Sequence, residues 1–256
     1  MILYVNGDSH SAGAELIKDY SFAQDDPKYK HLGRRAHPDA VPLTYGYKLS
    51  KTLNTGFYLD AESGSSNDRI LRTTREFLRD NRNQQYIIII GWSSWEREEW
   101  EHKDDFIQVN ASGQDSVPEE LQDRYKDFVA SSTRDKLEEK QLEWHQKIHD
   151  FHIELYDKNI KHLFFNSYSW FKKLWRPRIQ PKFEWHGCYY DPYEQSGTYS
   201  ETLNNQNILP VRHNSYHYGV DGHVLWHDIL LEQLTKQIGN VTMNTVKRNI
   251  KPSVRK

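Results

Sequence analysis

Gly7-Asp8-Ser9 places a hydroxyl directly after the first apolar run of the chain, residues 2–5. A serine in a tight turn between a strand and a helix exposes its hydroxyl, and the neighbouring backbone N–H groups can hold an oxyanion. Such a serine becomes a nucleophile when a histidine takes its proton and a third group orients that histidine. The alternative is an Asp/Ser helix cap, which needs no such partners.

The candidate partners lie near the other end of the chain, in the histidine-rich segment 213–227. Together, Gly7-Asp8-Ser9, Ser63-Gly64 and Gly222-His223-Val224-Leu225-Trp226 resemble the sequence blocks of the SGNH (GDSL-type) hydrolases. In that family the catalytic histidine lies six residues before the histidine of the Gly-His pair. Counting back six residues from His223 selects His217. The resemblance implies a serine esterase in which Ser9 is the nucleophile and His217 the general base.

The resemblance also assigns the remaining roles, with two departures from the family pattern. The acid position, three residues before His217, holds Asn214, and the asparagine of the third block falls on Ser93. The implied oxyanion donors are the N–H groups of Ser9 and Gly64 together with Ser93 or Asn67, whose side-chain amide could replace the missing asparagine. Asp221 is a second candidate acid. We expect His223 to be structural and to pack behind the loop that carries His217.

Apolar runs alternate with helical patterns along the chain and predict a doubly wound α/β fold with a central parallel sheet. We expect strands at 2–5, 56–59, 86–91 and 160–166, and helices at 45–53, 67–81, 119–156 (one helix or two) and 222–238. The resemblance implies the flavodoxin-like, three-layer α/β/α arrangement of SGNH hydrolases. Because the carboxyl ends of parallel strands share one edge, the loops that follow them should converge there.

Two segments interrupt this rhythm within an expected single domain of residues 1–256. Residues 19–42 read as a long loop, and residues 167–210 read as an aromatic-rich insertion. Aromatic faces bind sugar rings, but they also form satellite cores that hold an insertion in place. The expected substrate-binding residues at this edge are Trp92, Trp95, Trp170 and Trp175.

Composition excludes several classes of protein. A formal net charge of -2 argues against a nucleic-acid-binding protein, although the tail 247–256 is basic. No apolar stretch is long enough to span a membrane or serve as a signal peptide, and the single cysteine excludes an internal disulfide. We therefore expect a cytoplasmic protein that needs no cofactor and no metal. His145 and His149 have the spacing of zinc-binding helices, but they lack an evident third ligand and read as a partly solvated helix face.

The expected function is hydrolysis of an ester, with removal of an acetyl or other acyl group from a carbohydrate or small polar alcohol. An alternative is a binding or structural module of the same fold with weakened catalysis, and a third is an acyltransferase. The stretches ESGSSNDRIL and IIGWSSWEREEW resemble SGNH-like proteins of tailed bacteriophages. That resemblance implies a location in the infected host cytoplasm or in a virion.

Overall fold

The computed structural model describes residues 1–17, 35–114, 117–172 and 182–238. The basic tail, Trp175 and most of the segment 19–42 lie outside these residues. The strands are β1 (Ile2–Asn6), β2 (Gly56–Leu59), β3 (Tyr86–Trp92), β4 (Glu98–His102), β5 (Asp105–Val109) and β6 (Lys161–Asn166). The α-helices are α1 (Ser9–Ala12), α2 (Tyr45–Thr52), α3 (Asn67–Asp80), α4 (Gln122–Ser131), α5 (Arg134–Asp157), α6 (Tyr199–Asn205) and α7 (Val220–Ile238). Short 3-10 helices cover Val41–Leu43, Glu119–Leu121 and Gln195–Gly197.

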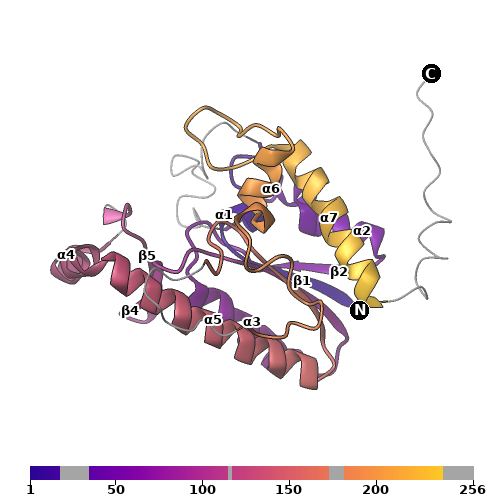
Figure 1. The fold of residues 1–256 in the computed structure, drawn as a ribbon, viewed down its shortest axis with the longest axis horizontal. Helices are drawn as coiled ribbons and strands as arrows, with labels where there is room; N and C mark the ends of the chain where they lie inside the picture. Colours follow the sequence, from indigo (N-terminus) through magenta and orange to yellow (C-terminus); the bar gives the residue numbers. More distant parts are fainter. Residues whose placement is uncertain (18–34, 115–116, 173–181, 239–256) are drawn as a thin grey trace.

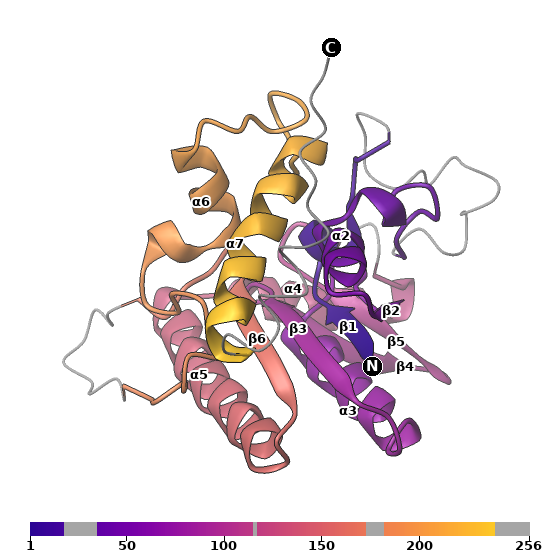
Figure 2. The ribbon, with the colours of Figure 1, turned by 90° about the vertical axis from the view of Figure 1, so that its right-hand side faces the viewer.

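A four-stranded sheet forms the centre of the molecule, in the order β2-β1-β3-β6. All three strand pairs are parallel, which confirms the predicted parallel α/β sheet. Helices α2 and α7 lie on one face of this sheet, and α3 and α5 lie on the other (Figure 1, Figure 2). This arrangement is compatible with a three-layer α/β/α fold. Among the described helices, none has the length and apolar character needed to cross a bilayer.

Alternation along the central strands explains why both faces of the sheet are covered. Successive side chains of a strand point to opposite faces, so a strand that is apolar throughout must be buried on both sides. Tyr4 packs into the core beneath α3 and α5, whereas its neighbours Leu3 and Val5 pack beneath α2 and α7. The same division runs through β3 and β6.

The helical region 119–156 forms two helices, α4 and α5, which is one of the two expected forms. The second helix begins because the Thr133 side chain accepts a hydrogen bond from the Lys136 N–H. Two other features were not expected from the sequence. The hairpin of β4 and β5 falls in a segment rich in glutamate and aspartate, where the charged side chains concealed the alternating pattern. Helix α6 lies within the segment 167–210, which we had expected to be irregular.

Two glycines allow α1 to sit close to the ends of β1 and β3. A Cβ added to Gly7 would lie 2.3 Å from Ser11 Oγ, and one added to Gly91 would lie 2.8 Å from the same oxygen. Ser11 cannot move away easily, because its hydroxyl accepts a 2.7 Å hydrogen bond from the buried Tyr45. The glycines therefore fix the position of the helix that carries Ser9.

This contact gives a prediction for stability. Gly7→Ala should lower the free energy of unfolding by about 2–3 kcal/mol, because the new methyl group overpacks the contact with Ser11. The matched control is Gly64→Ala, where an added Cβ meets no atom within 4 Å; the left-handed backbone there should cost only about 1 kcal/mol. Urea denaturation of the two variants measures the difference. Equal losses would contradict the proposed steric role of Gly7.

Candidate active site

Ser9 lies where the sequence placed it, at the first turn after β1. Asp8 caps α1, and its carboxylate accepts a 3.1 Å hydrogen bond from the His10 N–H. Ser9 is 6% exposed. Among the hydrogen bonds of the described residues, none involves the Ser9 side chain or its backbone N–H. Neither group is committed to a partner among the described residues.

His217 is held by a carboxylate that the sequence analysis did not identify. Its Nδ1 lies 2.9 Å from Glu15 Oε2. Arg212 donates to the other carboxylate oxygen at 2.6 Å, and the Ser215 hydroxyl donates to Oε2. The expected partner Asn214 is exposed, as is Asp221. The orientation expected from Asn214 is thus provided by Glu15, which supplies a full negative charge where asparagine would supply none.

Local backbone geometry explains why the sequence did not predict Glu15 as the partner of His217. Helix α1 ends at Gly13, whose φ of 72° is left-handed, and the chain turns again at Glu15 with a φ of 65°. A non-glycine residue in this region costs about 1–3 kcal/mol and persists where its surroundings hold it in place. Here the turn directs the Glu15 carboxylate towards the segment 212–217. The Glu15 side chain is only 2% exposed. No spacing rule relates residue 15 to residue 217.

The surroundings of Glu15 and His217 set the protonation state of each residue. Burial by itself would raise the pKa of Glu15, but hydrogen bonds from Ser215 and His217 and the charges of His217 and Arg212 outweigh it, so the pKa is lowered. Burial lowers the pKa of His217, helped by the nearby His10, while Glu15 opposes the shift. At neutral pH the structure therefore favours an ionised Glu15 beside a neutral His217. This is the protonation state that a general base requires.

A second carboxylate–histidine pair anchors the segment that carries His217. Asp8 Oδ1 lies 3.0 Å from His10 Nδ1, and His10 Nε2 lies 3.1 Å from the Tyr216 carbonyl oxygen. The rings of His10 and His217 are 5.3 Å apart. Both ring nitrogens of His10 are thus engaged, which leaves His217 as the ring whose Nε2 has no hydrogen bond among the described residues.

Two of the expected oxyanion donors are engaged inside the protein. The Asn67 side chain accepts from the Ser93 N–H at 2.7 Å and donates to the Ser93 carbonyl at 3.1 Å. The Ser93 hydroxyl donates to Asp8 Oδ2 at 3.0 Å and accepts from Arg97 at 2.9 Å. Both residues are fully buried. They join the loop after β3 to α3 and to Asp8, and in this structure neither presents its side chain to a ligand.

Gly64 retains the position expected of an oxyanion donor. Its backbone has a φ of 79°, and a Cβ placed there would meet nothing within 4 Å, so the residue borders open space. No acceptor for its N–H occurs among the described residues. The loop is tied to the first strand by a 3.2 Å hydrogen bond from the Glu62 N–H to the Gly7 carbonyl. The free N–H groups of Gly64 and Ser9 therefore follow neighbouring strands on the same edge of the sheet.

The structure does not show the interaction between Ser9 and His217 that the sequence predicted. Among the described residues there is no hydrogen bond between Ser9 Oγ and His217. Such bonds are often long in ligand-free enzymes and form only when substrate binds. The structure brings His217 to the segment that carries Ser9, through Glu15 and His10, without showing the bond itself.

The expected substrate-binding tryptophans are mostly interior. Trp92 is fully buried against Phe151 and Phe164, and Trp95 stacks on Phe171 at 4.8 Å. Trp170 is half-buried. The prediction that Trp92 and Trp95 wall the substrate cleft is therefore wrong, because both complete the core beneath α3 and α5.

Exposed aromatic side chains do occur at this edge, on two tyrosines that the sequence analysis did not select. Tyr168 follows β6 and is 51% exposed, and Tyr216 is 69% exposed. Their rings meet edge to face at 6.3 Å. Because the Tyr216 carbonyl contacts His10, this pair lies beside the candidate active site.

His223 packs behind the loop, as expected. It is buried, stacks on Tyr45, and accepts a 3.2 Å hydrogen bond from the Tyr45 N–H through Nδ1. Burial, with the charges of His10, Lys48 and His217, lowers the pKa of His223 to about 3. The neutral ring is therefore part of the folded structure.

The sign of the resulting pH dependence follows from this lowered pKa. An unfolded chain protonates His223 below about pH 6.5, whereas the folded chain does not, so stability falls as the pH drops. Between pH 7 and 5 this residue should remove about 2 kcal/mol from the free energy of unfolding. Replacing it in His223→Gln should reduce the pH dependence by that amount, as measured by urea denaturation at the two pH values. Identical pH dependence in the wild type and His223→Gln would contradict the assignment.

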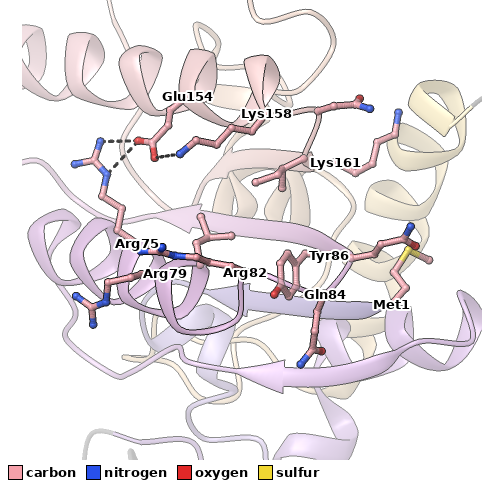
Figure 3. A pocket seen from close by; sticks show the side chains of 13 residues that line it. Met1, Arg75, Arg79, Arg82, Gln84, Tyr86, Glu154, Lys158 and Lys161 are labelled. Carbon is pink, nitrogen blue, oxygen red and sulfur yellow. Dashed lines mark hydrogen bonds and ion pairs between the residues drawn. The ribbon is translucent and has the colours of Figure 1, made fainter.

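A separate hollow lies at the opposite edge of the sheet (Figure 3). This cavity of about 900 Å³ is bordered by the first residues of β3 and β6, Tyr86 and Lys161. Glu154 on its wall binds Arg75 at 3.0 Å and Lys158 at 2.9 Å. Because it adjoins the amino ends of the strands, this cavity is no part of the site around Ser9.

Comparison with known proteins adds no identification. No protein-family model, no curated protein and no solved structure matches the chain.

Proposed function

We propose that the protein is a serine esterase of the SGNH type, with Ser9 as nucleophile, His217 as general base and Glu15 as the acid that orients it. The observation that carries the proposal is the 2.9 Å contact between His217 Nδ1 and the buried Glu15, reached from the same short segment that holds Ser9. A carboxylate on Nδ1 fixes the ring tautomer that leaves Nε2 free to accept a proton.

The proposed reaction has two halves. Ser9 Oγ attacks the ester carbonyl while His217 Nε2 takes the hydroxyl proton, and the charge on Glu15 stabilises the imidazolium that forms. The N–H groups of Ser9 and Gly64 stabilise the oxyanion. His217 returns the proton to the leaving alcohol, which departs as the acyl-enzyme forms. Water then attacks the acyl group with His217 again as base, and Ser9 is regenerated.

The substrate class that we propose is a short-chain ester of a polar alcohol such as an acetylated carbohydrate. Sugar rings stack on exposed aromatic faces, and the exposed pair Tyr168 and Tyr216 lies beside His217. Arg212 is also 47% exposed at this edge, where it can meet hydroxyl groups of a polar substrate. No step of this reaction requires a cofactor.

The alternative of a binding or structural module is favoured by two specific observations. The side chains of Asn67 and Ser93 are engaged inside the protein, and Ser9 and His217 are not hydrogen-bonded to each other. A binding module of this fold that catalyses no reaction would need neither free oxyanion donors nor a hydrogen bond between Ser9 and His217.

Hydrolysis of p-nitrophenyl acetate distinguishes the two proposals. We expect the wild type to release p-nitrophenol, and Ser9→Ala to lower kcat/KM by about 10³-fold or more. The control is Ser94→Ala, whose hydroxyl follows β3 on the same edge but donates to Glu96, and it should retain activity. Equal activity in the wild type and Ser9→Ala would contradict the esterase proposal. An inactive wild type that still binds acetylated oligosaccharides would favour the binding module.

A further inference from the structure

Two histidines and the cysteine of the chain form a buried cluster away from the candidate active site. His152 lies on α5, His162 on β6, and Cys188 directly before Tyr189, which forms a parallel bridge with Phe164 of β6. One ligand atom from each residue lies within 4.8 Å of the other two. Their exposed fractions are 0%, 1% and 8%. The sequence analysis expected no metal, and because these three residues come from separate segments, no spacing between them indicated a metal site.

His145 and His149, the pair with the spacing of zinc-binding helices, have other partners. His145 is fully buried and its Nε2 lies 3.1 Å from the Tyr193 hydroxyl, so the expected solvated helix face is wrong at this position. His149 stacks on Phe183 at 4.0 Å. Neither belongs to the cluster of His152, His162 and Cys188.

The hydrogen bonds around the cluster orient its two imidazole rings. His162 Nδ1 lies 2.8 Å from the Ile160 carbonyl oxygen, so this nitrogen carries hydrogen and Nε2 offers a lone pair. His152 Nε2 lies 3.0 Å from His186 Nδ1, which leaves His152 Nδ1 facing His162 Nε2 at 2.7 Å. Metal-binding histidines have this arrangement, in which the outer nitrogen is hydrogen-bonded and the inner nitrogen is directed at the ion.

We propose that His152, His162 and Cys188 bind a Zn²⁺ ion through His152 Nδ1, His162 Nε2 and the Cys188 thiolate. Nitrogen and sulfur ligands in a roughly tetrahedral set are the chemistry that zinc prefers, and a water completes the fourth position. The inner nitrogens must separate by about 0.5–1 Å to share the ion at normal bond lengths.

Binding releases one proton. Before binding, His152 Nδ1–H donates to His162 Nε2, and His186 Nδ1–H donates to His152 Nε2. In the zinc-bound form, His152 carries its hydrogen on Nε2 and donates to His186, whose own hydrogen moves to the exposed Nε2. His152 and His186 each still carry one ring hydrogen, and the proton that is released to solvent comes from the thiol of Cys188.

The ion would link three separate segments of the fold. The segment around Cys188 pairs with β6 through two 2.8 Å hydrogen bonds, from Phe164 N–H to the Cys188 carbonyl and from Tyr190 N–H to the Phe164 carbonyl. Zinc would fasten this segment to both β6 and α5. His162 is the second residue of β6, so the ion would lie away from the carboxyl edge where Ser9 is found. The proposal does not depend on the esterase assignment.

Cobalt substitution tests the site directly. The full-length protein is stripped of metal with a chelator, kept reduced, and titrated with Co²⁺ and then Zn²⁺ while absorption is recorded. We expect one Co²⁺ per chain with tetrahedral d–d bands and a thiolate charge-transfer band, all removed by Zn²⁺. Cys188→Ala should abolish the charge-transfer band and weaken Zn²⁺ binding by about 100-fold or more. His149→Gln, one turn away on α5, should leave both unchanged.

Two further outcomes keep the test decisive. If Cys188→Ala does not fold, as judged by circular dichroism, the exposed His186→Gln replaces it and should weaken binding by about 10–100-fold, because it removes the partner of His152. A folded wild-type protein that binds no stoichiometric Co²⁺ or Zn²⁺ overturns the proposal. Equal weakening by His149→Gln and Cys188→Ala overturns the ligand assignment.

Discussion

Replacing Glu15 by glutamine is expected to lower kcat for ester hydrolysis by about 10²–10⁴-fold while the protein remains folded. The amide is nearly the same size as the carboxylate, but it carries no charge to stabilise the imidazolium of His217 in the transition state. The pH profile should move as well. Glu15 opposes the lowering of the His217 pKa, so its removal should shift the acidic limb of kcat/KM to still lower pH.

Glu62→Gln is the matched control for this substitution. Glu62 is also a carboxylate on the carboxyl edge of the sheet, and it binds Arg69 at 2.9 Å without contacting His217. We expect its activity to stay within about threefold of the wild type, as for a charge outside the reacting groups. Activity of Glu15→Gln equal to that of Glu62→Gln would contradict the role of Glu15.

His217→Ala is expected to reduce kcat/KM by about 10³-fold or more, because it removes the ring proposed to take the proton from Ser9, and both ring nitrogens of the neighbouring His10 are engaged. Added imidazole should restore part of the activity, since the vacated space can admit a free base. A purely structural histidine would not respond in this way. His213→Ala, which removes an exposed ring from the same segment, should change neither activity nor the response to imidazole. Full activity in His217→Ala would contradict the assignment of His217 as base. The assignment would also be contradicted if imidazole had no effect on His217→Ala, as is expected for His213→Ala.

Periodicity and strand-end residues were sufficient to predict the main body of the fold. The runs at 2–5, 56–59, 86–91 and 160–166 correspond to β1, β2, β3 and β6. Most residues of β1, β3 and β6 are buried, and a strand covered on both faces must be apolar throughout, whereas β2 at the edge of the sheet is only partly buried. The hairpin of β4 and β5 escaped, since its residues face solvent on one side and carry charge. Helix boundaries were close where Ser66 and Thr44 act as N-caps.

The site was predicted less completely than the fold, for a physical reason. Ser9 and Gly64 follow strands, so their place at the carboxyl edge follows from topology. Glu15 reaches His217 only through a left-handed turn after α1, and a single sequence carries no signal for that contact. Burial could not be foreseen either. Trp92 ends β3 and Asn67 begins α3, both near the carboxyl edge of the sheet, yet packing directs their side chains into the interior.

The central claim is that Ser9 is a nucleophile activated by His217 and Glu15. The most direct test is reaction of the folded protein with a fluorophosphonate ester, followed by intact-mass measurement and peptide mapping. We expect one phosphonate per chain, attached to Ser9, with labelling strongly slowed in His217→Ala and Glu15→Gln and absent from the unfolded protein. Labelling that persists in Ser9→Ala, or no labelling of the folded wild type, would contradict the claim.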